Sequence, residues 1–361
     1  MTMLHSFAYP TRLKVGCIGA GRHAFRDILP CLRYLPIELV ALADHDREQG
    51  IATASLFGAK RFYPNHKALL AKETALDAVL IVVGPNERGE PAYPELAADA
   101  LRAGFHVWIE SPSCANRDDV KTLTNASMRG RKFIQTNLNG MFMPAYLKAG
   151  AIAESPSFGK PSSFVMRYPA LLPPEAFGKP CKDVGSLLGI VRPYATLMRL
   201  FGEPRGMMVA TNPLTGDACI TLGYRTELVG TLHLCGNQGM GGARERLEVI
   251  GQGAHVIVEN ATRVTYHRPS RIESDPDHLD ATDYYGAEAE APVVWEPQLS
   301  QAAAYNQHLV IQGHLGSLEH FATRLLSNEP PKHGNVVDLL HIMLVLQKIQ
   351  EGEQRTWLNL Y

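Results

Sequence analysis

The chain has 361 residues, of which 45% are hydrophobic and 20% are charged, and its formal net charge is −1. This is more residues than one hydrophobic core of ordinary size contains, so the length predicts two domains. The net charge is close to zero and no block of like charges occurs, which argues against nucleic acid or an anionic membrane surface as the main partner. No apolar run reaches the ~18 residues of a membrane span and the first residues lack a signal-peptide pattern, so we expect a cytoplasmic protein that does not enter a membrane.

The first part of the chain alternates short apolar segments with longer mixed segments. We expect strands at residues 13–18, 38–44, 78–84, 106–110 and 132–138, and helices at residues 25–35, 45–58, 94–104 and 117–130. Pro30 should bend or shorten the first helix, and Gly58 should close the second. Continuous apolar strands separated by helices indicate a parallel sheet covered on both faces. We therefore predict an α/β fold with an N-terminal, doubly wound Rossmann domain over residues 1–139.

The second part, residues 140–361, has a different pattern. Strand-like segments follow one another closely, a long helix is expected at residues 188–202, and two amphipathic helices at 316–328 and 335–352 close the chain. We expect an α+β domain with a large, mainly antiparallel and open sheet, and a surface excursion at residues 268–300. The expected strands lie at residues 162–168, 206–212, 218–225, 228–236, 246–252, 254–260 and 263–269.

A glycine pattern follows the first strand. It has the form Gly19-x-Gly21-x-x-Ala24 and is followed by Asp44 at the end of the second strand. In this fingerprint the first glycine permits a tight turn, the second lets the backbone approach a pyrophosphate, and the third, small residue lets helix and strand pack closely. An acid after the second strand suits the ribose hydroxyls of NAD and repels the phosphate of NADP. We expect NAD as the cofactor, with NADP less favoured, although Arg47 can tolerate it.

Four segments of the chain resemble one protein family. Residues 76–120, 137–150, 246–260 and 310–331 are similar to the Gfo/Idh/MocA family of NAD(P)-dependent sugar and cyclitol oxidoreductases. The resemblance runs over nearly the whole chain. It implies a nicotinamide cofactor held in the first domain and a sugar-like small-molecule substrate at the junction of the domains. It also implies homodimers or homotetramers assembled through the C-terminal sheet.

The first motif of the family is altered in this chain. Relatives carry Glu-Lys-Pro after the strand that ends the nucleotide site, and here residues 110–112 are Glu-Ser-Pro. The lysine is therefore replaced by Ser111, whose hydroxyl can relay a proton but is too weak an acid or base to hold one.

The second motif of the family is also altered. Members of the family carry Asp and, four residues later, His on a helix before a Gly-Glu-Pro turn. In this chain the turn is at residues 202–204, and counting back puts Leu188 at the Asp position and Arg192 at the His position. A later acidic position of the family falls on Ala195. Leucine has no acid–base chemistry and arginine stays protonated in proteins. Pro193 should kink this helix or mark its first turn.

The candidate site follows from the motifs and the resemblance. For catalysis we expect Tyr194, Lys182 and Arg192. For substrate binding we expect Tyr168, Lys182, Asp183 and Arg192. For cofactor binding the expected residues are Gly19, Gly21, Arg22, His23, Asp44, His45, Arg47, Val83, Gly84, Asn86, Glu110, Ser111 and Asn139.

Three functions remain open with these substitutions. The first is a dehydrogenase or reductase for a carbohydrate, cyclitol or glycoside with unusual acid–base residues. The second is an NAD-dependent glycoside hydrolase that uses transient oxidation, and the third is a regulatory protein that binds NAD(H) and a sugar without turnover. Arg192 adds the hypothesis of an anionic substrate, because a guanidinium forms paired hydrogen bonds with carboxylate or phosphate. Its pairing with a structural carboxylate such as Asp183 is equally open.

The six cysteines and fourteen histidines show no metal-binding spacing. None of the cysteines forms a CxxC or CxxH pattern, which favours reduced thiols over a disulfide framework or a zinc site. We therefore expect no metal.

Overall fold

The chain folds as two units that alternate along the sequence. The computed structural model describes residues 9–170, 184–212, 214–239, 241, 244–269, 291–298, 307–351 and 354–360. Unit 1 comprises Met1–Phe142, Pro180–Ala195 and Gln312–Lys348, and unit 2 comprises Met143–Lys179, Thr196–Ile311 and Ile349–Tyr361. Unit 1 thus includes two later segments of the chain besides the expected Rossmann domain.

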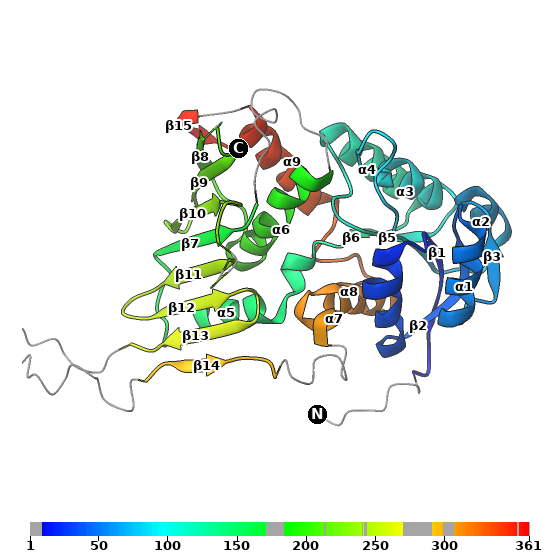
Figure 1. Cartoon of the computed structure of the whole chain (residues 1–361), viewed down its shortest axis with the longest axis horizontal. Coiled ribbons are helices and arrows are strands. Elements are labelled where there is room, and N and C mark those ends of the chain that lie inside the picture. Colours follow the sequence, from blue (N-terminus) through cyan, green and yellow to red (C-terminus); the bar gives the residue numbers. More distant parts are fainter. Residues whose placement is uncertain are drawn as a thin grey trace, which may run out of the picture. The chain divides into compact units, whose positions relative to one another are not determined.

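Unit 1 is built on six parallel strands in the order β3-β2-β1-β4-β5-β6 (Figure 1). This is the strand order of a doubly wound dinucleotide-binding fold, in which the order reverses between β1 and β4. The predicted Rossmann fold is therefore confirmed. The strands are β1 (Leu13–Ile18), β2 (Ile37–Ala43), β3 (Arg61–Tyr63), β4 (Ala78–Ile81), β5 (His106–Ile109) and β6 (Ile134–Thr136).

Helices cover both faces of this sheet. Right-handed crossovers place the segments between β1 and β3 on one face and those between β4 and β6 on the other. In Figure 1, α3 and α4 lie together, and α8 packs on the opposite side against the helical turns that follow β1. The helical elements are η1 (Ala24–Ile28), η2 (Leu29–Tyr34), α1 (Arg47–Phe57), α2 (His66–Lys72), α3 (Tyr93–Arg102), α4 (Arg117–Gly130), η3 (Asn139–Phe142) and α8 (His314–Leu326).

The first helix is irregular where a single helix was expected. Residues 24–28 form a π-helical turn and residues 29–34 a 3-10 helix, with Pro30 in the first turn of the latter. Proline lacks a backbone N–H and its ring crowds the carbonyl of the preceding turn, so it disfavours a regular α-helix at this position. The second helix ends as predicted, because Gly58 adopts a left-handed conformation with φ of 82°.

Unit 2 contains a nine-stranded sheet in the order β14-β13-β12-β11-β7-β10-β9-β8-β15. All neighbouring pairs are antiparallel except β7 and β10, which run parallel. The expected large, mainly antiparallel sheet is therefore confirmed. The strands are β7 (Ser163–Tyr168), β8 (Gly206–Asn212), β9 (Asp217–Gly223), β10 (Val229–Leu234), β11 (Arg246–Ile250), β12 (His255–Glu259), β13 (Arg263–His267), β14 (Val293–Trp295) and β15 (Gln354–Asn359).

The two faces of this sheet differ in burial. Along β7, Phe164, Met166 and Tyr168 are buried, whereas Val165 is 53% exposed. This alternation is typical of an antiparallel sheet with one covered face. Helix α5 (Pro144–Ala153) packs against β12 and β13 on the covered face. The remaining helices are α6 (Val184–Phe201), α7 (Gln307–Ile311) and α9 (Val336–Gln350).

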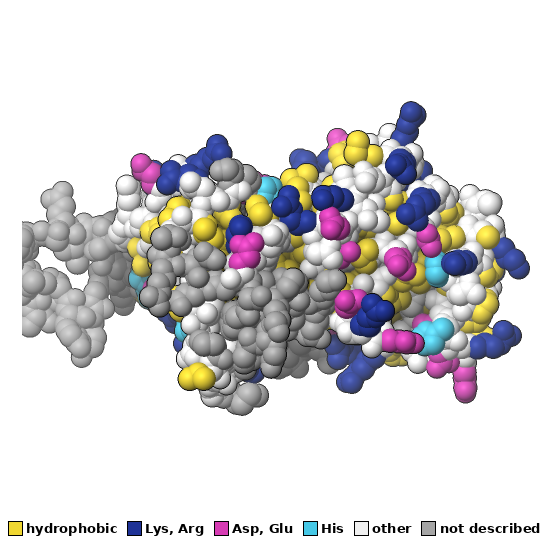
Figure 2. Space-filling model, turned by 90° about the horizontal axis from the view of Figure 1, so that it is seen from above, with side chains coloured by type: hydrophobic (Ala, Val, Ile, Leu, Met, Phe, Trp, Pro, Cys, Tyr) yellow, Lys and Arg dark blue, Asp and Glu magenta, His cyan; other side chains and the backbone are white. Residues whose placement is uncertain are grey.

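The surface is mixed in charge. On the face shown in Figure 2, Lys and Arg side chains are interspersed with Asp and Glu side chains. Within the described residues, no helix combines the length and the apolar character that crossing a membrane requires.

Candidate functional site

The turn after β1 has the backbone that the glycine pattern requires. Gly19 has a φ of 104°, and a Cβ built on it would lie 2.0 Å from the carbonyl oxygen of Val82. A side chain is therefore excluded by both conformation and space. A Cβ on Gly21 meets no atom within 4 Å. The small size of Gly21 thus leaves open space beside the start of the helical segment, where a phosphate group would be accommodated.

Asp44 fixes this turn to the end of β2. Its Oδ2 accepts a 2.6 Å hydrogen bond from the Ala20 amide, and its Oδ1 accepts a 2.8 Å bond from the Asp46 amide. Gln49 Nε2 donates to the Ala20 carbonyl at 2.6 Å. The carboxylate is therefore held at the mouth of the turn with a defined orientation.

A pocket of about 180 Å³ adjoins this carboxylate. Its walls are mainly aliphatic and come from the ends of β1, β2 and β4 and from α3, which suits a flat heteroaromatic ring such as adenine. The lining residues are Ile18, Gly19, Ala43, Asp44, His45, Pro64, Asn65, His66, Val83 and Leu96. Together with the open space at Gly21, the pocket and the acid fit an adenine dinucleotide.

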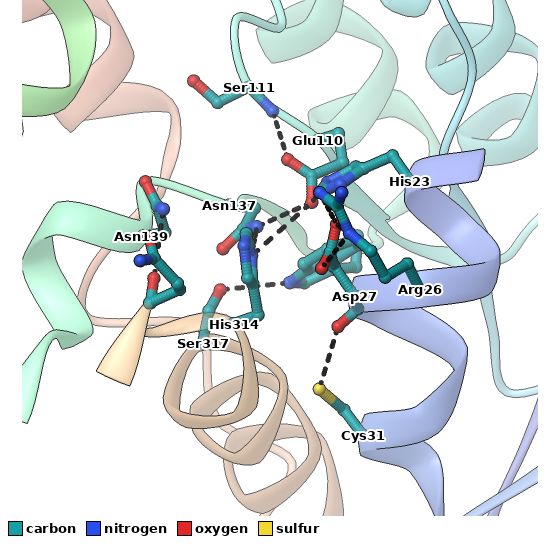
Figure 3. Close-up of polar contacts among 12 residues, drawn as sticks. His23, Arg26, Asp27, Cys31, Glu110, Ser111, Asn137, Asn139, His314 and Ser317 are labelled. Carbon is teal, nitrogen blue, oxygen red and sulfur yellow. Dashed lines mark hydrogen bonds and ion pairs between the residues drawn. The ribbon is translucent and has the colours of Figure 1, made fainter. Parts of the chain in front are cut away.

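A cluster of polar side chains lies beyond the glycine turn, at the carboxyl ends of β5 and β6 (Figure 3). We call His23, Asp27, Glu110, Asn137 and His314 the His–Glu cluster. His23 Nε2 lies 2.9 Å from Glu110 Oε1, and His23 Nδ1 lies 2.8 Å from Asp27 Oδ2. Asn137 Nδ2 donates to Glu110 Oε1 at 2.7 Å and lies 2.9 Å from His314 Nδ1. All five residues belong to unit 1.

Most of the Rossmann part of unit 1 matches a known protein family. Residues 13–137 match the model of an oxidoreductase family with an NAD-binding Rossmann fold, GFO_IDH_MocA. Residues 13–137 are therefore similar to the Gfo/Idh/MocA oxidoreductases. No curated protein matches the chain in sequence.

Solved structures of low identity share the fold over nearly the whole chain. An oxidoreductase from Agrobacterium radiobacter in complex with NAD+, L-tartaric acid and magnesium has a TM-score of 0.75 at 16% identity, with 97% of this chain and 99% of that chain covered. A dehydrogenase from Chromobacterium violaceum has a TM-score of 0.76 at 18% identity, covering 94% of each chain. KijD10 from Actinomadura kijaniata, a 3-ketoreductase whose variant was solved with TDP-benzene and NADP, has a TM-score of 0.65 at 19% identity, covering 95% and 98%. The predicted Gfo/Idh/MocA resemblance and α/β fold are therefore confirmed.

The charges in the His–Glu cluster are strongly coupled. Burial alone would lower the pKa of His23, but hydrogen bonds and charges from Glu110 and Asp27 raise it to about 9. Burial alone would raise the pKa of Glu110, but the hydrogen bond and charge of His23 and the hydrogen bond from the Ser111 amide bring it below its ordinary value. At neutral pH, His23 is therefore a cation between two carboxylates.

His314 has the opposite protonation. Burial lowers the pKa of His314, and the charges of His23 and Arg192 lower it further against the attraction of Glu110. Because the ionised Glu110 only accepts hydrogen bonds, Asn137 must turn its amide nitrogen toward it. The same nitrogen then donates to His314 Nδ1, so the neutral imidazole carries its proton on Nε2.

A buried hydrogen-bond network holds α8, and with it His314, against the sheet. Trp108 Nε1 donates to Ser317 Oγ at 3.2 Å, and Gln135 Nε2 donates to the Ser317 carbonyl at 2.8 Å. His320 Nδ1 lies 2.9 Å from Gln135 Oε1. These contacts fix the start of α8 next to β5 and β6.

The other residues predicted for cofactor binding all lie in unit 1. The exposed His45 lies with its Nδ1 3.3 Å from Asp44 Oδ1, and Arg22 and Arg47 are exposed. In the turn after β4, a Cβ on Gly84 would meet no atom within 4 Å, and Asn86 Oδ1 accepts bonds from two following amides. Of the remaining three, Val83 lines the pocket, Ser111 donates its amide to Glu110 Oε2 at 3.0 Å, and Asn139 donates to the Gln312 carbonyl at 3.0 Å.

The structure describes three of the five residues predicted for catalysis and substrate binding. Lys182 and Asp183 lie outside the described residues. Helix α6 carries Tyr194, which is 1% exposed, and Arg192, which is half-buried, and it passes through Pro193. Tyr168 ends β7 in unit 2 and is 9% exposed.

Three members of the His–Glu cluster were not predicted from the sequence. Asp27 lies in a helix that was expected to be regular, and His314 is 177 residues from Asn137. The sequence has no local pattern that joins such distant positions. Residues 310–331 do resemble a segment of the family, but this resemblance assigned no role to His314 or to any other residue in the segment.

Proposed function

We propose that the protein is an NAD(P)-dependent oxidoreductase that interconverts a hydroxyl and a carbonyl group on a carbohydrate, a cyclitol or a related polyhydroxylated molecule. The observation that carries this proposal is the position of the His–Glu cluster. It lies at the carboxyl ends of β5 and β6 and is joined to the glycine turn through His23, and in open α/β sheets ligands bind outside these strand ends.

The cofactor is held by residues of unit 1. Gly19 and Gly21 shape the phosphate turn, and Asp44 faces the ribose that follows the adenine pocket. Each oxygen of Asp44 already accepts one amide hydrogen bond, which keeps the carboxylate in place for the ribose hydroxyls and against a 2′-phosphate. We therefore propose NAD as the preferred cofactor, although relatives of the same fold are solved with NAD+ and with NADP.

The bound nicotinamide supplies the hydride acceptor or donor. In the oxidative direction an alcohol and NAD(P)+ give a carbonyl compound, NAD(P)H and one proton, so the protein must accommodate the hydroxyl proton and the charge on its oxygen. Ser111 and Arg192 replace the family's lysine and histidine and do not do this. We assign the role to the His–Glu cluster in preference to Tyr194, because Tyr194 is 1% exposed whereas the His23 side chain is 44% exposed.

The proposed substrate class follows from the family resemblance and from Arg192. The resemblance favours a sugar-like molecule, and the ketoreductase of the same fold was solved with TDP-benzene. The positive charge of Arg192 acts on His314, so an anionic substituent on the substrate would be favoured near the cluster.

We also propose a homo-oligomer formed through the outer face of the unit 2 sheet, where Val165, Val229 and Ile250 are exposed.

The test is an activity screen. Purified protein is incubated with NAD+ or NADP+ and with sugars, uronates, inositols and glycosides, while reduced-nicotinamide absorbance and product release are followed together. Formation of reduced cofactor with one substrate class is the expected result. Glycoside cleavage without net reduced cofactor would replace the proposal by a hydrolase, and binding of cofactor and sugar without either signal would replace it by a regulatory protein.

A further inference from the structure

The His–Glu cluster contains three potential metal ligands. One nitrogen each of His23 and His314 and one carboxylate oxygen of Glu110 lie within 4.8 Å of one another. His23 Nε2 is 2.9 Å and His314 Nδ1 is 3.9 Å from Glu110 Oε1. Ligand atoms of a tetrahedral site with metal–ligand bonds of about 2.0 Å are separated by about 3.3 Å. One distance is shorter and the other longer than this separation, so the three side chains would have to move slightly to reach the tetrahedral geometry.

The partners around these ligands favour a metal site. His23 Nδ1 pairs with Asp27 Oδ2 at 2.8 Å, and Arg26 in turn holds Asp27 by hydrogen bonds of 2.8 to 3.0 Å. Glu110 Oε2 accepts the Ser111 amide at 3.0 Å. Metal-binding histidines nearly always donate their second nitrogen to a carboxylate or carbonyl, and ligating carboxylates are likewise hydrogen-bonded. A metal ion would replace the proton that lies between His23 Nε2 and Glu110 Oε1, and that proton would be released to solvent on binding.

Asn137 supplies an independent observation. Its side chain is 1% exposed, and its Oδ1 has no hydrogen-bond partner among the described residues. Its Nδ2 lies 2.7 Å from Glu110 Oε1 and 2.9 Å from His314 Nδ1. A half-turn of the amide would exchange these atoms and place the carbonyl oxygen between the two ligands. The carbonyl oxygen would then face the cation, and the amide nitrogen would take the position that the oxygen holds now.

We propose that the cluster binds one divalent transition-metal ion, with His23 Nε2, Glu110 Oε1 and His314 Nδ1 as ligands and Asn137 Oδ1 available as a fourth. Two imidazoles and one carboxylate favour Zn²⁺ over Mg²⁺ or Ca²⁺, which prefer oxygen ligands. Two histidines and one glutamate also form the ligand set of a class of catalytic zinc sites that keep one position for water or substrate. The ligands come from a helical segment, a strand end and the start of α8, which are all parts of unit 1.

A cation at this position would have a role in catalysis. That role rests on the proposed oxidoreductase function. A bound Zn²⁺ polarises a carbonyl oxygen and lowers the pKa of a hydroxyl that it contacts. In the oxidative direction the hydroxyl proton would pass to solvent water while the hydride passes to the nicotinamide. The ion would thus perform the task that Ser111 and Arg192 cannot perform at the family's motif positions.

The experiment measures metal binding without cofactor or substrate. Protein without a histidine tag is stripped with a chelator and titrated with Zn²⁺ by calorimetry and with Co²⁺ by visible absorption. We expect one equivalent of metal and a tetrahedral Co²⁺ spectrum. His314→Gln and His23→Gln should each weaken binding by at least about 100-fold, and Asp27→Asn, which lies outside the ligand set, should weaken it by about 10- to 100-fold. His106→Asn is the matched control, because it changes a half-buried histidine of the same unit that is not in the cluster, and it should bind like wild type.

Two results would overturn the inference. One is the absence of stoichiometric binding at millimolar metal, and the other is binding that His314→Gln, His23→Gln and Asp27→Asn leave unchanged while circular dichroism shows folded variants. Dehydrogenase activity that is equal in metal-free and metal-loaded protein would overturn the catalytic role of the ion and leave the proposed oxidoreductase function standing. Metal binding in a protein that binds neither NAD+ nor NADP+ would support the site and remove the proposed function.

Discussion

His23 and Glu110 are 87 residues apart in the sequence and are joined by a 2.9 Å contact between His23 Nε2 and Glu110 Oε1. The contact links the helical segment after the glycine turn to the end of β5. The residues proposed for cofactor binding and the polar groups proposed for catalysis belong to one unit.

Gly21→Val should abolish cofactor binding without unfolding the protein. The added side chain would enter the open space beside the turn, where no protein atom lies within 4 Å of a Cβ, and would occupy the position of the phosphates. We expect the Kd for NAD+ to rise at least about tenfold, a loss of about 1.4 kcal/mol, with little change in melting temperature. Calorimetric titration and thermal unfolding measure the two quantities.

Two glycine variants serve as controls for this prediction. Gly239→Val also places a Cβ in open space, but in unit 2, and should leave both quantities unchanged. Gly19→Ala should instead destabilise the fold, because its Cβ would meet the Val82 carbonyl and φ is 104°. Wild-type affinity of Gly21→Val for NAD+ would exclude the turn as the phosphate site.

Asp44→Ser should shift the preference between the two cofactors. The substitution removes the charge that repels a 2′-phosphate, and it also removes hydrogen bonds to the Ala20 and Asp46 amides. We therefore expect weaker binding of NAD+ and a rise of at least about tenfold in the ratio of NADP+ to NAD+ affinity. Asp77→Asn is the control, since Asp77 accepts the Lys14 amide at 2.7 Å away from the pocket. An unchanged ratio in Asp44→Ser would show that Asp44 does not face the ribose.

Ser317→Ala should weaken the attachment of α8. Ser317 is fully buried, and its hydroxyl accepts the indole N–H of the fully buried Trp108. Without it this donor has no partner, which costs about 1–3 kcal/mol. Urea unfolding measures the change against Ser55→Ala on the exposed face of α1, where we expect a change within about 0.5 kcal/mol. Equal stability of the two variants would contradict a structural role for this hydrogen bond.

The expected strands of the Rossmann sheet and their parallel arrangement illustrate what the sequence could predict. A continuous apolar run such as residues 78–82 predicts a buried strand directly. Strand β3 was missed, because its three residues include no buried side chain. Strand β15 near the chain end was missed as well, since its partner β8 lies far away in the sequence.

Some residues of the candidate site could be predicted from the sequence and others could not. Gly19, Gly21 and Asp44 follow a local pattern whose spacing is set by one turn and one strand, so the sequence could predict them. The His–Glu cluster depends on the packing of α8 against β5 and β6. No sequence spacing encodes that His314 faces Asn137 and Glu110, and only the fold brings these residues together.

His106 should make stability depend on pH. Its Nδ1 accepts the Phe133 amide at 3.0 Å, and burial, with a smaller effect of the Lys132 charge, lowers its pKa from 6.5 to about 4. The folded state therefore favours the neutral ring. His106 therefore contributes to the free energy of unfolding above pH 6.5, its pKa in the unfolded chain. This contribution is lost as the pH falls from 6.5 towards about 4, since the unfolded chain then binds more protons.

His106→Asn tests this dependence. The amide oxygen of Asn can accept the Phe133 amide but does not titrate. The loss of unfolding free energy between about pH 7 and pH 4.5 should therefore be smaller in the variant than in wild type, as measured by urea unfolding at each pH. Parallel curves for the two proteins would contradict the assignment.

The central claim is that the protein transfers a hydride between a nicotinamide and a polyhydroxylated substrate at the His–Glu cluster. The most direct test is deuterium transfer from 4-deuterated NADH or NADPH to a panel of keto-sugars and keto-cyclitols, followed by mass spectrometry. We expect one product labelled at carbon by the wild type. His314→Gln should bind the reduced cofactor with unchanged affinity but transfer label at least about 100-fold more slowly, within the range for loss of a group that handles the substrate proton. Label transfer by neither protein across the panel, or equal rates from both, would contradict the account.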